Sequence, residues 1–234
     1  MQIFLINPNA TASMTAAVAT SARRIAASGT RIVEGTGKGA APVSIEGFSD
    51  EAMAVPSMLA QIRAAEAGGA AATVIACFDD PGLDAAREVA AGPVLGLCQS
   101  AVQAAMVLAK RFSIITTLPR SVPVIEDLVQ RYGAGQHCRK VRAIDLPVLA
   151  LEEDAAHAFA LLEAGIARAR DEDGAEAVVL GCAGMSEMTE ALSRATGVLV
   201  IDGVTVAVKL AEALVGCGLR TSKANAYAFP RVKC

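Results

Sequence analysis

Residues 73–77 read Thr-Val-Ile-Ala-Cys, and residues 178–182 read Val-Val-Leu-Gly-Cys. Each segment is a short apolar run that ends in a cysteine and is followed by turn-forming residues, as expected for a buried strand of a parallel sheet. The two cysteines are 105 positions apart. These segments predict that a unit built around one such strand occurs twice in the chain.

The segments on either side support this duplication. Residues 4–6 align with 112–114 at a spacing of 108, and residues 93–95 align with 197–199 at a spacing of 104. Gly69 and Gly174, again 105 positions apart, are expected to end the helices before the two middle strands. Expected strands of the first half lie at 3–7, 73–77 and 93–97.

Helical segments alternate with these strands. Apolar residues recur at spacings of three and four, which predicts helices at 13–28, 49–67, 99–110 and 205–215. Alternating strands and helices form parallel sheets. We therefore expect an α/β protein with two pseudo-symmetric lobes, each a short, mostly parallel sheet flanked by helices. Residues 1–97 and 206–234 would form the first lobe and 98–205 the second, with the active site in the cleft between them, at the carboxyl ends of the strands.

The composition excludes several classes of protein. Of the 234 residues 53% are hydrophobic and 3% aromatic, which suits a core of aliphatic side chains and excludes a disordered chain. With 21 basic and 24 acidic residues the net charge is −3, so nucleic acid is not an expected partner. We expect neither a signal peptide nor a membrane span, which predicts a cytoplasmic protein whose cysteines are thiols.

The sequence contains neither a metal-binding motif nor a nucleotide-binding motif. The six cysteines form no C-x-x-C pair and there are only two histidines, so a metal site is not predicted. The glycine-rich residues 35–39 lack the spacing and the Lys-Ser/Thr pair of a phosphate-binding loop. We interpret residues 35–45 as a mobile loop that could form a lid.

Cys77 and Cys182 are the candidate catalytic residues, because the repeat places both at equivalent strand ends. The turns after them lead to helices expected to begin at Leu83 and Ser186, whose first N–H groups would favour an anion and lower the pKa of a thiol. Asp80, before Pro81, is expected to cap the first of these helices. The other cysteines are expected to be structural; they are Cys98, Cys138, Cys217 and Cys234.

The exits of the first strands carry small neutral groups. Asn9 and Thr117 share the spacing of 108, and each could contact a ligand or serve only as a turn residue. Asp79, close to the thiol of Cys77, could fix a polar group of a ligand. No Arg or Lys occurs at these exits, which disfavours a substrate held by its carboxylate.

Two thiols on opposite sides of a small neutral ligand suit the removal of a proton from one face of a carbon and its return from the other. One sulfur must be a thiolate and the other a thiol, and the reverse reaction exchanges their roles. Helix-start N–H groups would stabilise the enolate. No cofactor is required.

These motifs together resemble the hydantoin racemase family, within the aspartate/glutamate racemase superfamily. The resemblance covers nearly the whole chain and rests on Asn-Pro-Asn at 7–9, Ile-Ala-Cys-Phe-Asp-Asp at 75–80, Thr-Thr-Leu at 116–118, Ser-Val-Pro at 121–123 and Gly-Cys-Ala-Gly-Met at 181–185. It implies a cofactor-independent two-base racemase of 5-monosubstituted hydantoins, a homo-oligomer in which Cys77 and Cys182 are the bases. The residues expected to bind substrate are Asn9, Phe78, Asp79, Thr116, Thr117, Gly181, Ala183 and Gly184.

Other activities within the superfamily are the alternatives. Amino-acid racemases carry Gly-Cys-Thr-His at the second cysteine, whereas Ala183 and Gly184 follow Cys182 here, which points away from free glutamate or aspartate. Allantoin racemases look like close relatives with the same cysteine pair, although Asp79 and residues 121–123 favour 5-alkyl or 5-aryl hydantoins. An arylmalonate-type decarboxylase, which keeps only the thiol equivalent to Cys182, and a non-catalytic two-lobed binder are the remaining alternatives.

Overall fold

The computed structural model describes residues 1–231, and the chain divides into two compact units. Of the described residues, the first unit contains 1–76, 80–96 and 207–231, and the second contains 77–79 and 97–206. Each unit holds one four-stranded sheet in which all paired strands are parallel. The predicted α/β fold with two similar sheets is confirmed.

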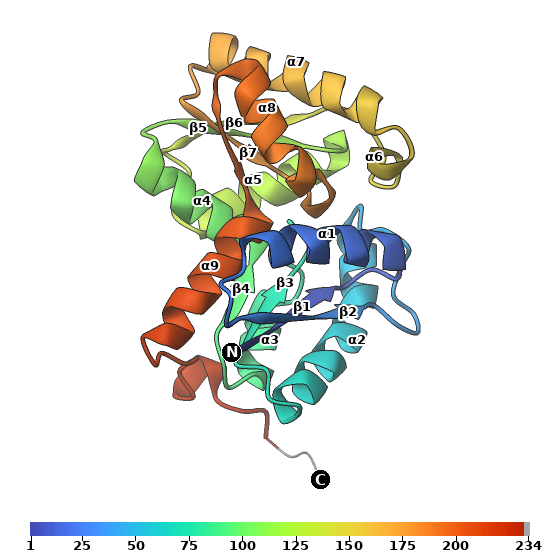
Figure 1. The fold of residues 1–234 in the computed structure, drawn as a ribbon, viewed down its shortest axis with the longest axis vertical. Coiled ribbons are helices and arrows are strands. Elements are labelled where there is room, and N and C mark those ends of the chain that lie inside the picture. The colour runs from blue at the N-terminus through green and yellow to red at the C-terminus, as the bar shows by residue number, and fades with distance from the viewer. Residues whose placement is uncertain (232–234) are drawn as a thin grey trace. The chain divides into compact units, whose positions relative to one another are not determined.

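The sheet of the first unit has the strand order β2-β1-β3-β4. Its strands are β1 (Gln2–Asn7), β2 (Arg31–Thr36), β3 (Ala72–Ile75) and β4 (Val94–Gly96). Helices α1 (Ala12–Ile25), α2 (Phe48–Ala67) and α3 (Leu83–Val89) belong to this unit. Figure 1 shows α1 on one side of this sheet and α2 and α3 on the other; α1 contacts β1 and β2, while α2 contacts β1 and α3.

The sheet of the second unit has the equivalent order β6-β5-β7-β8. Its strands are β5 (Phe112–Thr116), β6 (Cys138–Ala143), β7 (Ala177–Leu180) and β8 (Leu199–Asp202). Its helices are α4 (Leu97–Leu108), α5 (Val122–Arg131), α6 (Ala150–Glu153), α7 (Ala155–Asp173) and α8 (Thr189–Thr196), and α9 (Gly203–Gly216) begins in it and continues into the first unit. Side chains of β5, β7, α7 and α8 form one apolar core; it includes Ile115, Leu162, Ile166, Leu180 and Leu192.

Strand pairing defines the repeat more exactly than the sequence does. Phe4 pairs with Thr73 and Ser113 pairs with Val178, so β1 and β5 correspond at a spacing of 109 rather than 108. The expected equivalence of Asn9 and Thr117 is therefore wrong by one residue. A strand buried on both faces shows no alternation of polar and apolar residues, so its sequence does not reveal such a slip.

The last strands of the two sheets also correspond differently from the sequence alignment. Gly96 pairs with Ile75, and Asp202 pairs with Leu180, so Gly96 and Asp202 are equivalent at a spacing of 106 rather than 104. Asp202 accepts hydrogen bonds from the backbone N–H (2.9 Å) and the hydroxyl (2.7 Å) of Thr205 in α9. The first unit has no side chain at the equivalent strand end.

Two strands were not predicted, and both lie at sheet edges. The β2 strand carries Arg31 and Glu34, and β6 carries three basic residues, which are usual on edge strands and hide the apolar pattern. Gly35 and Thr36 end β2, so their assignment to a loop is wrong. The β8 strand also begins two residues later than expected, at Leu199.

Gly174 has the predicted role at a helix end. It follows α7 in the left-handed conformation, with a φ of 63°, and its N–H reaches the last turn. In the first unit the C-cap residue of α2 is Gly68, and Gly69 comes after it with a φ of 94°. Among the residues that the structure describes, no helix has the length and apolar character needed to cross a membrane.

Candidate active site

Cys77 and Cys182 occupy equivalent positions in the two sheets. Each is the second residue after the end of a central strand, β3 for Cys77 and β7 for Cys182. Both are partly exposed, whereas Cys98 is buried. Each thiol thus lies at the carboxyl edge of its own parallel sheet, which is the edge where α/β proteins bind ligands.

The segment after Cys77 is buried and tightly packed. Phe78, Asp79 and Asp80 are 3%, 9% and 5% exposed. Asp80 has a φ of 46°, and its carboxylate lies over Gly96: a Cβ added to Gly96 would be only 2.4 Å from its Cγ. The N-cap residue of α3 is Gly82 and not Asp80, which differs from the prediction. This packing fixes the chain just beyond the thiol.

The segment after Cys182 forms a 3₁₀ turn at once. This turn covers Ala183–Met188, earlier than the helix start expected at Ser186, and α8 follows it at Thr189. The first N–H groups of such a turn have no partner within it, so they are suited to an anion. A Cβ added to Gly184 would lie 3.3 Å from Cδ1 of Leu151 and 3.9 Å from the Cys182 sulfur, so this glycine packs closely against Leu151 beside the thiol.

Hydrogen bonds join the exits of β5 and β7. The Thr116 hydroxyl donates to the Gly181 carbonyl (3.1 Å), and the Gly181 N–H donates to the Ile115 carbonyl (2.7 Å). The carbonyl of Thr117 accepts from the N–H of Leu146. Thr116 and Thr117 are 1% and 3% exposed. These contacts give Thr116 and Gly181 a structural role next to Cys182, and direct contact with substrate stays a prediction.

Asn9 is held in a network at the exit of β1. Its side-chain oxygen accepts from the Asn7 amide (2.8 Å) and the Thr11 N–H (2.9 Å), and its own amide donates to the Met14 sulfur (3.6 Å). Gly37, just after β2, donates its N–H to the carbonyls of Asn7 and Asn9. Because sulfur is a weak acceptor, the side-chain N–H of Asn9 is the group in this network that is best suited to donate to a ligand.

The loop after β2 is attached to the same exit. The Ala10 N–H donates to the Pro42 carbonyl (2.7 Å), and the Thr11 hydroxyl donates to the Val43 carbonyl (2.6 Å). A Cβ at Gly37 would be 2.2 Å from the Pro8 carbonyl oxygen, so glycine is required there. That residues 37–45 act as a lid stays a prediction.

Most of the predicted site residues belong to one compact unit. The second unit contains both cysteines and seven of the eight residues expected to bind substrate, and Asn9 belongs to the first. Within residues 1–231 no cluster of three or more His, Cys, Asp or Glu side chains is placed to hold a metal ion.

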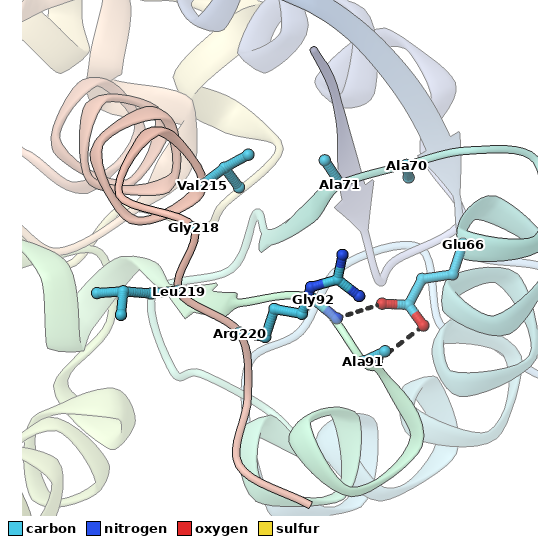
Figure 2. A pocket seen from close by; sticks show the side chains of 9 residues that line it. All are labelled: Glu66, Ala70, Ala71, Ala91, Gly92, Val215, Gly218, Leu219 and Arg220. Atoms are coloured by element: carbon cyan, nitrogen blue, oxygen red, sulfur yellow. Dashed lines mark hydrogen bonds between the residues drawn. The ribbon is translucent and has the colours of Figure 1, made fainter.

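A cavity of about 330 Å³ lies at the opposite edge of the first sheet. It is lined by residues just before β3 and β4 and by the end of α9, so it is at the amino ends of the strands. Figure 2 shows the Glu66 carboxylate in this cavity, accepting from the N–H groups of Ala91 (2.9 Å) and Gly92 (2.7 Å). None of the predicted site residues lines it.

Glu51 is a polar residue that no sequence motif singles out. It lies in the first turn of α2, and its Oε1 is buried without a hydrogen-bond partner. Burial, and secondarily the charge of Asp50, raises the pKa of this carboxyl. An acidic residue on the buried face of a predicted helix is the signal that could have identified it.

Comparisons with known proteins agree with this description. A profile of the Asp/Glu/Hydantoin racemase family matches residues 3–211. The chain is 64% identical to a hydantoin racemase of Rhizobium meliloti, covering 100% of this chain and 96% of the relative, and 43% identical to one of Pseudomonas sp. (strain NS671), covering 100% and 93%. The structure of an allantoin racemase from Klebsiella pneumoniae superposes with a TM-score of 0.96 at 48% identity, over 100% of this chain and 95% of that one. The chain therefore belongs to the Asp/Glu/hydantoin racemase family.

Proposed function

We propose that this chain is a cofactor-independent racemase of 5-monosubstituted hydantoins in which Cys77 and Cys182 are the two bases. The observation that carries the proposal is the equivalent position of the two thiols, each two residues beyond a central strand of its sheet. A racemase needs a base for each face of the carbon, and a duplicated strand end supplies the same group twice. Hydantoin racemases that are 64%, 43% and 40% identical over the full chain support this substrate class.

The proposed step balances without a cofactor. The thiolate of one cysteine takes the proton from C5, and the electron pair of the C–H bond moves into the adjacent carbonyl to give an enolate. The thiol of the other cysteine then gives its proton to the opposite face of C5. At the end of the step the first cysteine is a thiol and the second is a thiolate. This is the protonation state that the enzyme needs to convert the product enantiomer back. General acid–base transfer of this kind contributes about a hundred- to ten-thousand-fold.

The start of the 3₁₀ turn after Cys182 would stabilise the enolate. Its first backbone N–H groups would donate to the oxyanion, and a preorganised donor of this kind contributes about 3 kcal/mol.

Racemisation of allantoin, a hydantoin with a 5-ureido group, is the second candidate. The allantoin racemase structures from Klebsiella pneumoniae and Pseudomonas fluorescens match with TM-scores of 0.96 and 0.95, at 48% and 38% identity. The identity to a hydantoin racemase, 64%, is higher than to either allantoin racemase, and Asp79 with residues 121–123 favours alkyl or aryl substituents. A polarimetric comparison of allantoin with benzyl-, isobutyl- and methylthioethyl-hydantoin decides between them through kcat/KM.

Deuterium exchange tests the two-base mechanism directly. In deuterated water the enzyme should exchange the C5 proton of a chiral hydantoin while optical rotation is lost. Cys77→Ala and Cys182→Ala should each abolish racemisation, and each single variant should still exchange the proton of one enantiomer only. Full racemisation by Cys77→Ala would exclude the two-base mechanism, and a wild-type protein that neither exchanges nor racemises would be a binder instead.

The proposal includes a homo-oligomer in the cytoplasm, as the resemblance to the family implies. Light scattering should give a molar mass that is a multiple of the 23.9 kDa of one chain. A mass of one chain at enzyme concentrations that racemise hydantoin would exclude the oligomer without affecting the mechanism.

A further inference from the structure

A buried carboxylate oxygen of the first unit lacks a hydrogen-bond partner. Among the residues that the structure describes, Oε1 of Glu51 is the buried side-chain oxygen or nitrogen without one. Buried polar atoms are nearly always paired, because an unpaired one loses its hydration without compensation. Such an atom therefore calls for an explanation, and a ligand that supplies the missing hydrogen is one.

Glu51 lies over the buried face of α2. It is three residues before Ala54 and seven before Met58, both 0% exposed, and residues at these spacings share one side of a helix. Side chains of a helix lean toward its amino end. The Glu51 carboxyl therefore extends from the buried face toward the beginning of α2.

The beginning of α2 is at the edge of the sheet where the strands leave. Helix α2 connects β2 to β3, which both run parallel to β1, so the helix starts at the carboxyl ends of the strands and returns to their amino ends. Asn9 follows β1 at this edge, and Cys77 follows β3. The unpaired oxygen thus lies at the edge of the sheet that carries the predicted site.

Contacts of α2 reach Gly82, which precedes α3 and is five residues after Cys77. A Cβ added to Gly82 would be 2.9 Å from Cγ2 of Val55 and 3.2 Å from Cε of Met58, so α2 packs directly against the end of this segment. Val55 is four residues after Glu51, which is about one helical turn, or about 5 Å along the axis. Glu51 is thus the next side chain beyond this contact, in the direction of the strand exits.

Two backbone N–H groups at the beginning of α2 already have acceptors other than Oε1 of Glu51. The Glu51 N–H donates to the Gly47 carbonyl (3.1 Å), and the Asp50 carboxylate accepts from the Glu46 N–H (3.1 Å). The neighbouring loop therefore does not satisfy Oε1. Because a carboxylate oxygen can only accept, the group that completes it must be a donor.

We propose that Glu51 is a substrate-binding residue whose Oε1 accepts a hydrogen bond from a ring N–H of the bound hydantoin. This inference rests on the proposed function. A 5-monosubstituted hydantoin has two ring N–H donors, one next to C5 and one between the two carbonyls. Binding one of them would fix the orientation of the hydantoin ring. It would also supply a hydrogen-bond donor to Oε1 of Glu51.

Hydantoins methylated at N1 or N3 test this contact together with Glu51→Ala. Wild-type enzyme should bind one of the two N-methyl compounds about 10- to 100-fold more weakly than the parent, as expected for a lost hydrogen bond to a carboxylate. The Glu51→Ala variant should bind the parent more weakly by a similar factor and should no longer discriminate against that N-methyl compound. A methyl group that merely clashes with another wall would be discriminated against equally in both proteins.

Glu51→Gln and Asp50→Asn are the matched controls. Both remove a carboxylate charge from the first turn of α2, but Asp50 is paired with the Glu46 N–H, so Asp50→Asn should leave the KM for hydantoin unchanged. Glu51→Gln keeps an acceptor oxygen and should recover most of the affinity that Glu51→Ala loses. Thermal unfolding of Glu51→Gln should occur no lower than that of the wild type, since Oε1 of Glu51 makes no hydrogen bond within the protein that would be lost.

The outcomes separate this inference from the proposed function. A wild-type protein that does not racemise unmethylated hydantoin refutes the proposed function. A wild-type protein that racemises it, with discrimination against both N-methyl compounds unchanged in Glu51→Ala, refutes only the role of Glu51. A lowered melting temperature in Glu51→Ala with unchanged KM would show a structural role and also refute the inference.

Discussion

The substitution Gly96→Ala should disturb the segment that carries Cys77 by adding a single methyl group. The added Cβ would lie 2.4 Å from Cγ and Oδ1 of Asp80 and 2.5 Å from Oδ2, whereas ordinary contact begins at 3.4 Å. The carboxylate would have to retreat by about 1 Å. It is 5% exposed, and the backbone of Asp80 has a φ of 46° and is followed by proline, so there is little room for this movement.

The expected cost follows from this overlap. Overpacking a filled site costs about 1–3 kcal/mol, which for a chain of this length lowers the melting temperature by about 3 to 10 °C. Asp80 is three residues after Cys77, and a shift of about 1 Å in a reacting group can reduce the rate about a hundredfold. We therefore expect kcat for racemisation to fall by about that factor, with a smaller change in KM.

Deuterium exchange at C5 and thermal unfolding, measured on the same preparations, test this prediction. Gly216→Ala is the matched control, because a Cβ there meets nothing within 4 Å. It should lower neither the melting temperature nor the rate of deuterium exchange. If Gly96→Ala melts within 1 °C of the wild type and exchanges at the wild-type rate, the rigidity assigned to the Asp80 contact is refuted.

Two further predictions concern the second unit and the cysteines. The Asp173 carboxylate accepts from the Arg142 guanidinium and the Ser113 hydroxyl, and pairing with Arg142 holds its pKa below the ordinary value of 3.8. Asp173→Asn should therefore cost about 2 kcal/mol at neutral pH, and urea unfolding should show this difference disappear as the pH falls below 3.8. Iodoacetamide at pH 8 should inactivate the enzyme by labelling Cys77 or Cys182, and substrate should slow the reaction. Burial raises the pKa of Cys138 to about 12, so peptide mapping should find Cys138 unlabelled in the folded protein, and inactivation that tracks the labelling of Cys138 would contradict this assignment.

The sequence predicted the parts of the fold that are buried on all sides. The central strands β3 and β7 are runs of mainly aliphatic residues bounded by turn residues. This pattern can be recognised without knowing which elements pack against the strands. The edge strands β2 and β6 were not predicted, since their exposed sides carry charged residues that resemble a loop.

Side-chain relationships at the site were harder to predict than the strands. The positions of the two cysteines followed from the repeat, because each directly follows an apolar run. The contact of Asp80 with Gly96 and the unpaired oxygen of Glu51 depend on distances between separate elements, which no local spacing encodes. The assignment of Asn9 and Thr117 as equivalents failed because a slip of one residue in a strand buried on both faces leaves no trace in hydrophobicity.

The two repeated halves differ at the ends of their last strands, β4 and β8. In one half an acid on the strand itself, Asp202, binds the helix that follows; in the other half that position is Gly96, and the space is filled by an acid brought in from the cysteine segment. The two halves are therefore no longer interchangeable. A chimeric gene that replaces only β4 (Val94–Gly96) with the residues of β8 would place an aspartate side chain where the Asp80 carboxylate now packs, and the Cys77 segment would lose this anchor.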